Sequence, residues 1–287
     1  MTRTIAAAIE TKQNTTKHNT KNDTSMTSPV QVITFDLWDT LIVDDSDEPK
    51  RAALGMEDKK TARRTLVYEM LSKTRPMGGP TENRIDRPMV DLAYDVTDSA
   101  FSKVWHEQFV TWTVKERIDV LLNGLGVKPA EDDLESLVKA HEEMELKVSP
   151  DFVENLRPML ETLKQKYRLA VVSDAIFSPG TTLRMLLKKA SILDCFHAFA
   201  FSDEVGRSKP HRAMFDAIAS ELDVSIESIV HIGDREHNDI KGPKNLGARA
   251  ILTTTVIDRG SENTDADAVC KNYNELPKIL AQLEGKP

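Results

Sequence analysis

Short apolar runs alternate with helical patterns along the second half of the chain, and one further run stands near the start. Many of these runs are rich in β-branched residues, which is typical of buried strands. The predicted strands are Val30–Leu37, Leu169–Ser173, Ala198–Phe201, Ile229–Ile232 and Ala250–Thr254. Helical spacing predicts the intervening helices Thr181–Lys189, His211–Leu222 and Ile240–Leu246. Alternation of strands and helices predicts an α/β fold with a doubly wound parallel sheet.

The stretch between the first two predicted strands has a different pattern. It shows amphipathic helical periodicity over Thr61–Arg75, Met89–Trp112 and Pro129–Val148. Thr113 and Glu116 have the spacing of a capping box, which predicts a further helix that ends near Gly124. The segment Arg75–Pro88 is predicted to form a long loop. We therefore expect a helical domain over residues 44–149, inserted into an α/β core formed by residues 29–43 and 150–287.

Residues 1–28 lack core-forming side chains and are rich in Thr, Lys and Asn, which predicts a disordered tail. The apolar part of the tail is too short for a secretory signal. A transit peptide is an alternative, but we favour a dispensable tail or a true start at Met26 over targeting. No apolar run approaches the roughly 20 residues that span a bilayer.

Charge and cysteine content narrow the functional classes. The formal net charge is -8, from 38 basic and 46 acidic residues, which argues against a general nucleic-acid binder. A metal ion and a few placed cations still allow an anionic substrate. Cys195 and Cys270 have no metal-ligand spacing and fit a reducing compartment, so we expect a cytoplasmic protein without membrane attachment. We expect Cys195 to pack in the core.

Side chains capable of chemistry follow four of the predicted strands at the point where each strand ends. They are Asp36 and Thr40, then Ser173 and Asp174, then Lys209, and finally Asp234 and Asp239. Ligands of open parallel sheets bind at the carboxyl ends of the strands, so these side chains should converge on one site.

This set of side chains suits phosphoryl transfer. A carboxylate at a strand end can attack phosphorus and form an acyl phosphate. Convergent carboxylates offer the hard oxygen ligands that Mg2+ prefers. The hydroxyl groups of Thr40 and Ser173 can hold phosphoryl oxygens, and Lys209 supplies a compact positive charge to the same group.

The order and spacing of these residues resemble the four motifs of the haloacid dehalogenase superfamily. The matching stretches are ITFDLWDTL, AVVSDA, SDEVGRSKP and HIGDREHNDI. The helical insertion resembles the C1-type cap of that family, and the resemblance extends from about Val30 to about Leu280. It implies a Rossmann-like core and a Mg2+-dependent hydrolase that acts on a small phosphorylated metabolite, as a monomer or homodimer.

The resemblance also implies a role for each site residue. Asp36 would be the nucleophile and a metal ligand, and Asp234 and Asp239 the other metal ligands. Ser173 and Lys209 would bind the phosphoryl group, and Lys209 would also be catalytic. Apart from the resemblance, we expect Thr40 and Asp174 to be phosphate-binding residues, with a helix cap as the equal alternative for Asp174.

One position departs from the pattern of the family's phosphatases. Those enzymes usually carry a second aspartate two residues after the nucleophile, as general acid and base, and here that residue is Trp38. Alternation along an extended segment sends Asp39 the other way, so we do not expect Asp39 to replace the missing acid. General acid catalysis contributes about 10²–10⁴-fold, so a phosphatase without it should be slow on poor leaving groups.

Trp38 leaves three functions open. The first is a phosphatase that uses a good leaving group, or an acid from the substrate or the cap. The second is a phosphonatase-like or 2-haloacid dehalogenase-like enzyme that hydrolyses a C–P or C–halogen bond, since an aromatic residue at this position resembles the dehalogenases. The third is a weakly catalytic protein that binds a phosphorylated ligand. We favour the first, because the dehalogenases lack the paired acids of the fourth motif and this chain has them as Asp234 and Asp239.

Other polar and aromatic residues have plainer interpretations. We expect His231 to pack within the sheet, and His237 and Arg235 to lie in a solvated loop. The aromatic residues Trp105, His106 and Trp112 should pack between helices. The basic residues Lys59, Lys60, Arg63 and Arg64 should form a solvated helix face.

Overall fold

The computed structural model describes residues 29–73 and 85–285. The predicted tail and most of the predicted loop Arg75–Pro88 lie outside these residues. Six parallel strands form one sheet in the order β5-β4-β1-β6-β7-β8. They are β1 Val32–Phe35, β4 Arg168–Ser173, β5 Ala198–Phe201, β6 Ile229–Gly233, β7 Arg249–Thr253 and β8 Ala268–Cys270. The predicted α/β fold with a doubly wound parallel sheet is confirmed.

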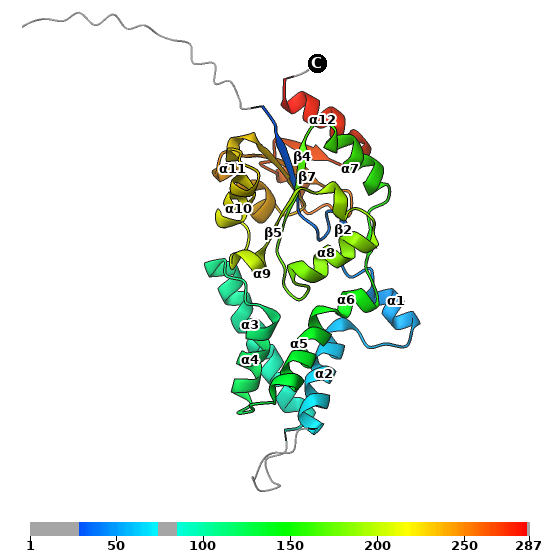
Figure 1. Cartoon of the computed structure of the whole chain (residues 1–287), viewed down its shortest axis with the longest axis vertical. Coiled ribbons are helices and arrows are strands. Elements are labelled where there is room, and N and C mark those ends of the chain that lie inside the picture. The colour runs from blue at the N-terminus through cyan, green and yellow to red at the C-terminus, as the bar shows by residue number, and fades with distance from the viewer. Residues whose placement is uncertain (1–28, 74–84, 286–287) are drawn as a thin grey trace, which may run out of the picture.

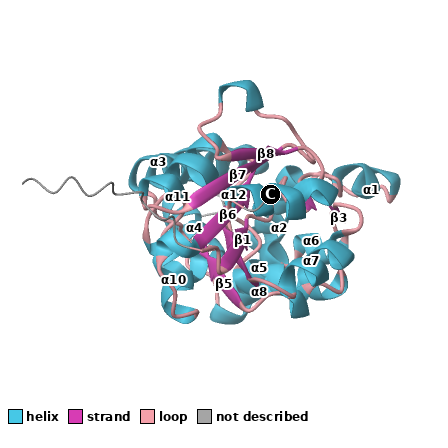
Figure 2. Ribbon diagram, turned by 90° about the horizontal axis from the view of Figure 1, so that it is seen from above, coloured by secondary structure: helices cyan, strands magenta, loops and turns pink. Residues whose placement is uncertain are grey.

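Helices cover both faces of this sheet (Figure 2). The α/β part contains α7 Leu156–Lys164, α8 Gly180–Lys189, α9 Ser202–Val205, α10 Ala213–Glu221, α11 Gly242–Asn245 and α12 Leu276–Leu283, with a π-helical turn over Glu236–Lys241. Ile33 and Phe35 of β1 pack in a core with α7, α8 and α12, whereas Val32 packs in a core with α10 on the other face. This alternation follows the two-residue period of a strand.

A two-stranded antiparallel ribbon marks the points where the chain leaves and re-enters the α/β part. The ribbon pairs β2 Ile42–Val43 with β3 Asp151–Phe152. All residues between these two strands belong to helices and loops in the part that the structure describes. The helices are α1 Glu48–Ala53, α2 Lys59–Lys73, α3 Arg87–Gln108, α4 Val114–Gly124, α5 Glu131–Glu142 and α6 Met144–Lys147.

Helices α2 to α5, which we call the helical lobe, lie beyond one end of the sheet (Figure 1). The lobe has its own apolar cluster, to which each of its helices contributes. The capping box of α4 is confirmed, because the Glu116 N–H donates to Thr113 Oγ1 and the Thr113 N–H donates to Glu116 Oε2. No helix among the described residues has the length and apolar character needed to cross a membrane.

Two predicted helix boundaries in the lobe are wrong. Helix α3 ends at Gln108 rather than at Trp112, because Phe109 adopts a left-handed backbone with φ of 53°. The helix predicted over Pro129–Val148 is divided into α5 and α6. Strand β8 was not predicted, because its three residues are too few for a recognisable apolar pattern.

A neutral histidine is buried in the lobe. His141 is 1% exposed, and its Nδ1–H donates to the Leu137 carbonyl at 2.8 Å. Its Nε2 accepts a hydrogen bond from the Tyr94 hydroxyl. Burial lowers the pKa of His141 to about 4, below its ordinary value of 6.5. Protonation would therefore remove an acceptor and place a charge in the apolar interior.

This histidine should make stability fall in acid. The unfolded chain binds the proton more readily than the folded chain. The contribution of neutral His141 to the free energy of unfolding is therefore complete above pH 6.5 and is lost as the pH falls toward 4. Between pH 7.5 and 5 we expect a loss of about 2 kcal/mol from this group. Urea unfolding at both pH values should show a smaller loss for His141→Gln than for the wild type. Equal losses in the two proteins would contradict the assignment.

Candidate active site

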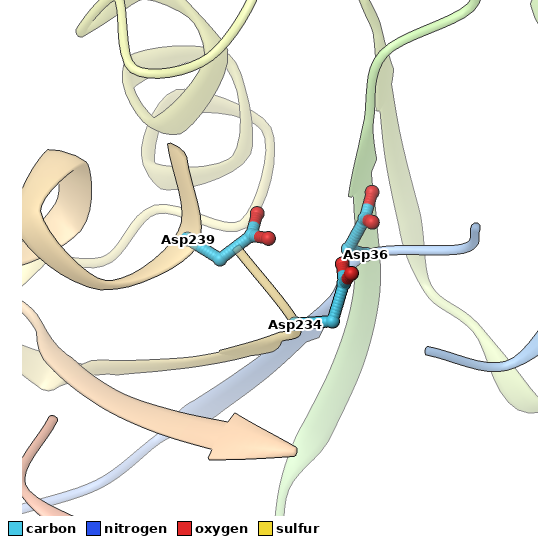
Figure 3. A group of neighbouring side chains, drawn as sticks. All are labelled: Asp36, Asp234 and Asp239. Carbon is cyan, nitrogen blue, oxygen red and sulfur yellow. The ribbon is translucent and has the colours of Figure 1, made fainter. Parts of the chain in front are cut away.

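Three aspartates converge at the carboxyl edge of the sheet (Figure 3). Asp36 directly follows β1, and its N–H donates to the Ile232 carbonyl of β6 at 2.9 Å. Asp234 directly follows β6, and Asp239 lies in the π-helical turn after it. One carboxylate oxygen from each of the three lies within 4.8 Å of the others, and all three residues are buried. Adjacent parallel strands therefore bring these distant segments together, as their positions at strand ends predict.

Lys209 joins two of the three carboxylates. Its Nζ lies 2.7 Å from Asp36 Oδ1 and 2.6 Å from Asp239 Oδ1, and its side chain is 2% exposed. Burial alone would lower the pKa of Lys209, but the carboxylates of Asp239, Asp36 and Asp174 raise it above its usual value. The lysine stays charged, and the backbone N–H of the same residue donates to Asp174 Oδ1 at 2.9 Å.

Asp239 is held on both of its oxygens. Oδ1 accepts from Lys209 Nζ and from His231 Nε2 at 3.1 Å, and Oδ2 accepts from the Arg235 N–H at 2.9 Å. Burial opposes ionisation of Asp239, but Lys209 and His231 outweigh it and hold its pKa below the usual range. A Cβ on Gly233 would lie 2.3 Å from Asp239 Cγ, so this close packing needs a glycine. His231 is buried within the sheet as predicted, and it also fixes this carboxylate.

Asp234 keeps one oxygen free. Its Oδ1 is buried and has no hydrogen-bond partner among the described residues, whereas Oδ2 accepts from Arg259 Nε at 2.5 Å. Burial, followed by the charges of Asp36 and Asp239, raises the pKa of Asp234 to about 7. An unpartnered buried oxygen beside two further carboxylates is a donor set that fits Mg2+, which prefers hard oxygen ligands.

The two predicted hydroxyl groups lie in the interior at the same edge. Thr40 and Ser173 are fully buried, and neither side-chain oxygen has a hydrogen-bond partner in the part of the chain that the structure describes. Neither residue lines the cavity described next, but Ser173 ends β4, which is paired with β1. Their predicted contact with a phosphoryl group stays a prediction.

A cavity of about 290 Å³ opens in front of Asp36, between the sheet edge and the helical lobe. Its floor includes Asp36, Asp174, Lys209 and Arg235. The opposite wall and the sides include Lys59, Arg63, Trp105, Glu145, Phe177 and Trp38. Trp38 therefore faces the cavity, while Asp39 is not among the lining residues, as the alternation of side chains predicts.

The prediction of a solvated basic face on α2 is wrong in part. Lys59, Arg63 and Arg64 are 6%, 8% and 7% exposed, and only Lys60 of the four lies at the surface. Lys59 Nζ pairs with Asp47 at 2.8 Å, and Arg63 lies 3.4 Å from Glu145. These charges are buried because acidic partners from neighbouring segments compensate them.

The aromatic residues of the lobe have mixed roles. Trp112 packs against Phe101, with ring centroids 5.9 Å apart, as predicted. Trp105 also packs against Phe101 but lines the cavity, so a purely packing role was wrong for it. His106 is exposed and lies against Trp105. Arg235 is exposed in its loop as predicted, and it also borders the cavity.

Arg259 was missed by sequence reasoning. It lies in the loop between β7 and β8 and contacts Asp234 and Asp39, the latter through Nη2 at 2.6 Å from Oδ2. The signal was available in principle, because this loop follows the carboxyl end of a predicted strand. A loop arginine without a motif around it gave no reason to select it.

Comparison with known proteins places the chain among hydrolases. A family model described as haloacid dehalogenase-like hydrolase matches residues 91–253, a range that begins after Asp36. The glyceraldehyde 3-phosphate phosphatase of Pyrococcus furiosus is 28% identical over 133 residues, covering 45% of this chain and 52% of that protein. The same enzyme of Methanopyrus kandleri is 29% identical over 164 residues, covering 55% and 64%. The chain thus spans about half to two thirds of the length of these curated relatives.

Solved structures show the same fold with different activities. A 2-haloacid dehalogenase from Pseudomonas syringae has a TM-score of 0.59 at 21% identity, covering 88% of this chain and 99% of that one. A haloacid dehalogenase-superfamily phosphatase from Thermococcus onnurineus has a TM-score of 0.56 at 22% identity, covering 88% and 97%. These similarities concern the fold alone. The family match over residues 91–253 shows that this chain belongs to the haloacid dehalogenase-like hydrolase family.

Proposed function

We propose that this protein is a Mg2+-dependent phosphatase of small phosphorylated metabolites, with Asp36 as its nucleophile. The observation that carries the proposal is the cluster of Asp36, Asp234 and Asp239, with Lys209 in contact with Asp36 and Asp239, beside a cavity that Asp36 and Lys209 line. Relatives named glyceraldehyde 3-phosphate phosphatase and pyrophosphatase PpaX support a phosphorylated substrate.

The proposed reaction has two steps. An oxygen of Asp36 attacks phosphorus, the bond from phosphorus to the leaving oxygen breaks, and an aspartyl phosphate forms. Water then attacks the phosphorus, which releases phosphate and restores the carboxylate. Lys209 orients Asp36 and offsets charge on the phosphoryl oxygens, while Thr40 and Ser173 donate their unpartnered hydroxyl groups to the same oxygens.

Asp36, Asp234 and Asp239 are the residues that would hold Mg2+. When bound, Mg2+ offsets the negative charge that the nucleophile and the phosphoryl group share. Asp234 offers a buried oxygen without a partner among the described residues, whereas both oxygens of Asp239 already accept hydrogen bonds.

Asp174 is our candidate for the proton donor that Trp38 does not supply. It lines the cavity, and it lies at the end of β4 beside Lys209. Burial raises its pKa to about 7, despite the opposing charge of Lys209. Near neutral pH, a fraction of the molecules would therefore carry a proton at this position, which is the requirement for a general acid.

The helical lobe is proposed to act as a cap of the C1 type, within the domain limits of residues 44–149. Lys59, Arg63, Trp105 and Glu145 reach the cavity from this region of the chain. A movement of the lobe against the sheet would admit substrate and exclude water. A cytoplasmic location, and a monomeric or homodimeric state, remain predictions.

Two other functions make different predictions. A 2-haloacid dehalogenase would release halide from 2-haloacids in the presence of EDTA. We consider this alternative because the fold is similar to that of such an enzyme. A non-catalytic protein would bind phosphorylated ligands without forming a covalent intermediate. The buried three-carboxylate cluster favours the phosphatase, because neither alternative has a need for it.

Phosphate release tests the proposed activity directly. A panel of small phosphate esters and acyl phosphates should give release with Mg2+, and little with EDTA. Asp36→Asn should lower the rate by at least about 10³-fold, because no carboxylate is then present to attack phosphorus and form the acyl phosphate. Release that persists in the variant, or without metal, would contradict the proposal.

The leaving group should determine the effect of Asp174. On an alkyl phosphate, Asp174→Asn should lower kcat by about 10²-fold, since a poor leaving group needs a proton. On an aryl phosphate with an acidic phenol, the same change should lower kcat far less. A rate that falls equally on both substrates would instead indicate that Asp174 only supports the position of Lys209.

A further inference from the structure

Arg259 bridges two carboxylates at the edge of the proposed metal site. Its Nε lies 2.5 Å from Asp234 Oδ2, and its Nη2 lies 2.6 Å from Asp39 Oδ2. The planar guanidinium group thus makes one charge-assisted hydrogen bond to each acid. The site proposed to hold Mg2+ therefore has an organic cation on its outer side.

Asp39 contacts Arg259 and does not line the cavity. It is 9% exposed, and its backbone adopts a left-handed conformation with φ of 52°, which aspartate tolerates better than most residues. Both of its oxygens are engaged, because Oδ1 accepts from the Asp44 N–H at 3.1 Å and Oδ2 accepts from Arg259. These contacts account for an acidic side chain at a position that does not face the cavity.

The loop that carries Arg259 is shaped by its own hydrogen bonds. Asp258 Oδ1 accepts from the backbone N–H groups of Gly260 and Ser261, at 3.0 and 2.8 Å, and Gly260 has a φ of +103°. Further along, Thr264 donates to Glu236 at 2.7 Å, which ties the loop to the π-helical turn after β6. Arg259 is therefore presented from a turn that is already ordered, which lowers the entropic cost of holding it in place.

We infer that Arg259, anchored by Asp39, is a positioning residue for Mg2+ binding by Asp234. The guanidinium group holds Oδ2, which leaves the buried, unpartnered Oδ1 as the oxygen available to a metal beside Asp36. This inference rests on the metal site of the proposed function. Groups that orient a metal ligand from outside typically contribute about 10–100-fold to metal affinity.

Repulsion between Arg259 and a divalent cation opposes this effect. Asp39 decides the balance, because its carboxylate neutralises the guanidinium charge through a close contact. The pair of Arg259 and Asp39 carries no net charge, so the repulsion is small and the orienting effect prevails. Removal of Arg259 should therefore weaken Mg2+ binding rather than strengthen it.

Isothermal titration calorimetry of the full chain with MgCl2 tests this inference without any substrate. We expect Arg259→Gln to raise the Kd for Mg2+ by about 10–100-fold. Asp39→Asn should raise it too, because Arg259 then loses its anchor and its neutralising partner. Arg259→Lys should fall between Arg259→Gln and the wild type, since a lysine can restore the charge but not both contacts. Arg212→Gln, which breaks an exposed pair with Asp216, is the matched control and should leave Kd unchanged.

Thermal unfolding in EDTA shows whether each variant remains folded. A folded Arg259→Gln or Arg259→Lys protein with unchanged or tighter Mg2+ binding would overturn the inference. Asp234→Asn is the control for the metal site, because this variant should lose Mg2+ binding whether or not Arg259 positions Asp234. If the wild type itself binds no Mg2+, both proposals fail. If the wild type binds Mg2+, Asp234→Asn does not, and the Arg259 and Asp39 variants bind it as tightly as the wild type, the metal site is supported and the positioning role of Arg259 is contradicted.

Discussion

The buried contact of Lys209 with Asp36 and Asp239 is the interaction on which the rest of the site depends. Carboxylates this close and this buried repel one another, and each would tend to take up a proton. The lysine offsets that repulsion at 2.7 and 2.6 Å, and its own charge is kept by the acids around it. His231 and the missing side chain of Gly233 complete the arrangement. The carboxyl edge of the sheet can then concentrate negative charge without loss of the fold.

On the opposite wall of the cavity, buried positive charges are likewise paired with acidic side chains. Lys59 and Arg63 are buried because Asp47 and Glu145 accompany them. Phe177 lies between Arg63 and Arg117, with guanidinium carbons 3.6 and 3.9 Å from the ring centroid. These contacts fix the charged side chains of the helical insertion against the α/β part, so the cavity has defined walls on both sides.

Sequence patterns predicted the parts of the molecule that depend on local periodicity. The central strands were visible because they are buried on both faces, and the site residues were visible because they follow those strands. Lys59 and Arg63 were misjudged because their partners are remote, and burial of a charge depends on such partners. Arg259 meets Asp39 across 220 residues, which no local pattern encodes. Strand β8 has three residues and α6 has four, which is too few for a recognisable periodic pattern.

The central claim is that Asp36 accepts the phosphoryl group, and trapping that intermediate tests it most directly. Turnover of acetyl phosphate with Mg2+ would be quenched in acid, and the digested protein would be mapped by mass spectrometry. The account predicts one phosphoryl group on the peptide that contains Asp36, absent when EDTA replaces Mg2+. Phosphate release with the phosphoryl group on another residue, or on none, would contradict it.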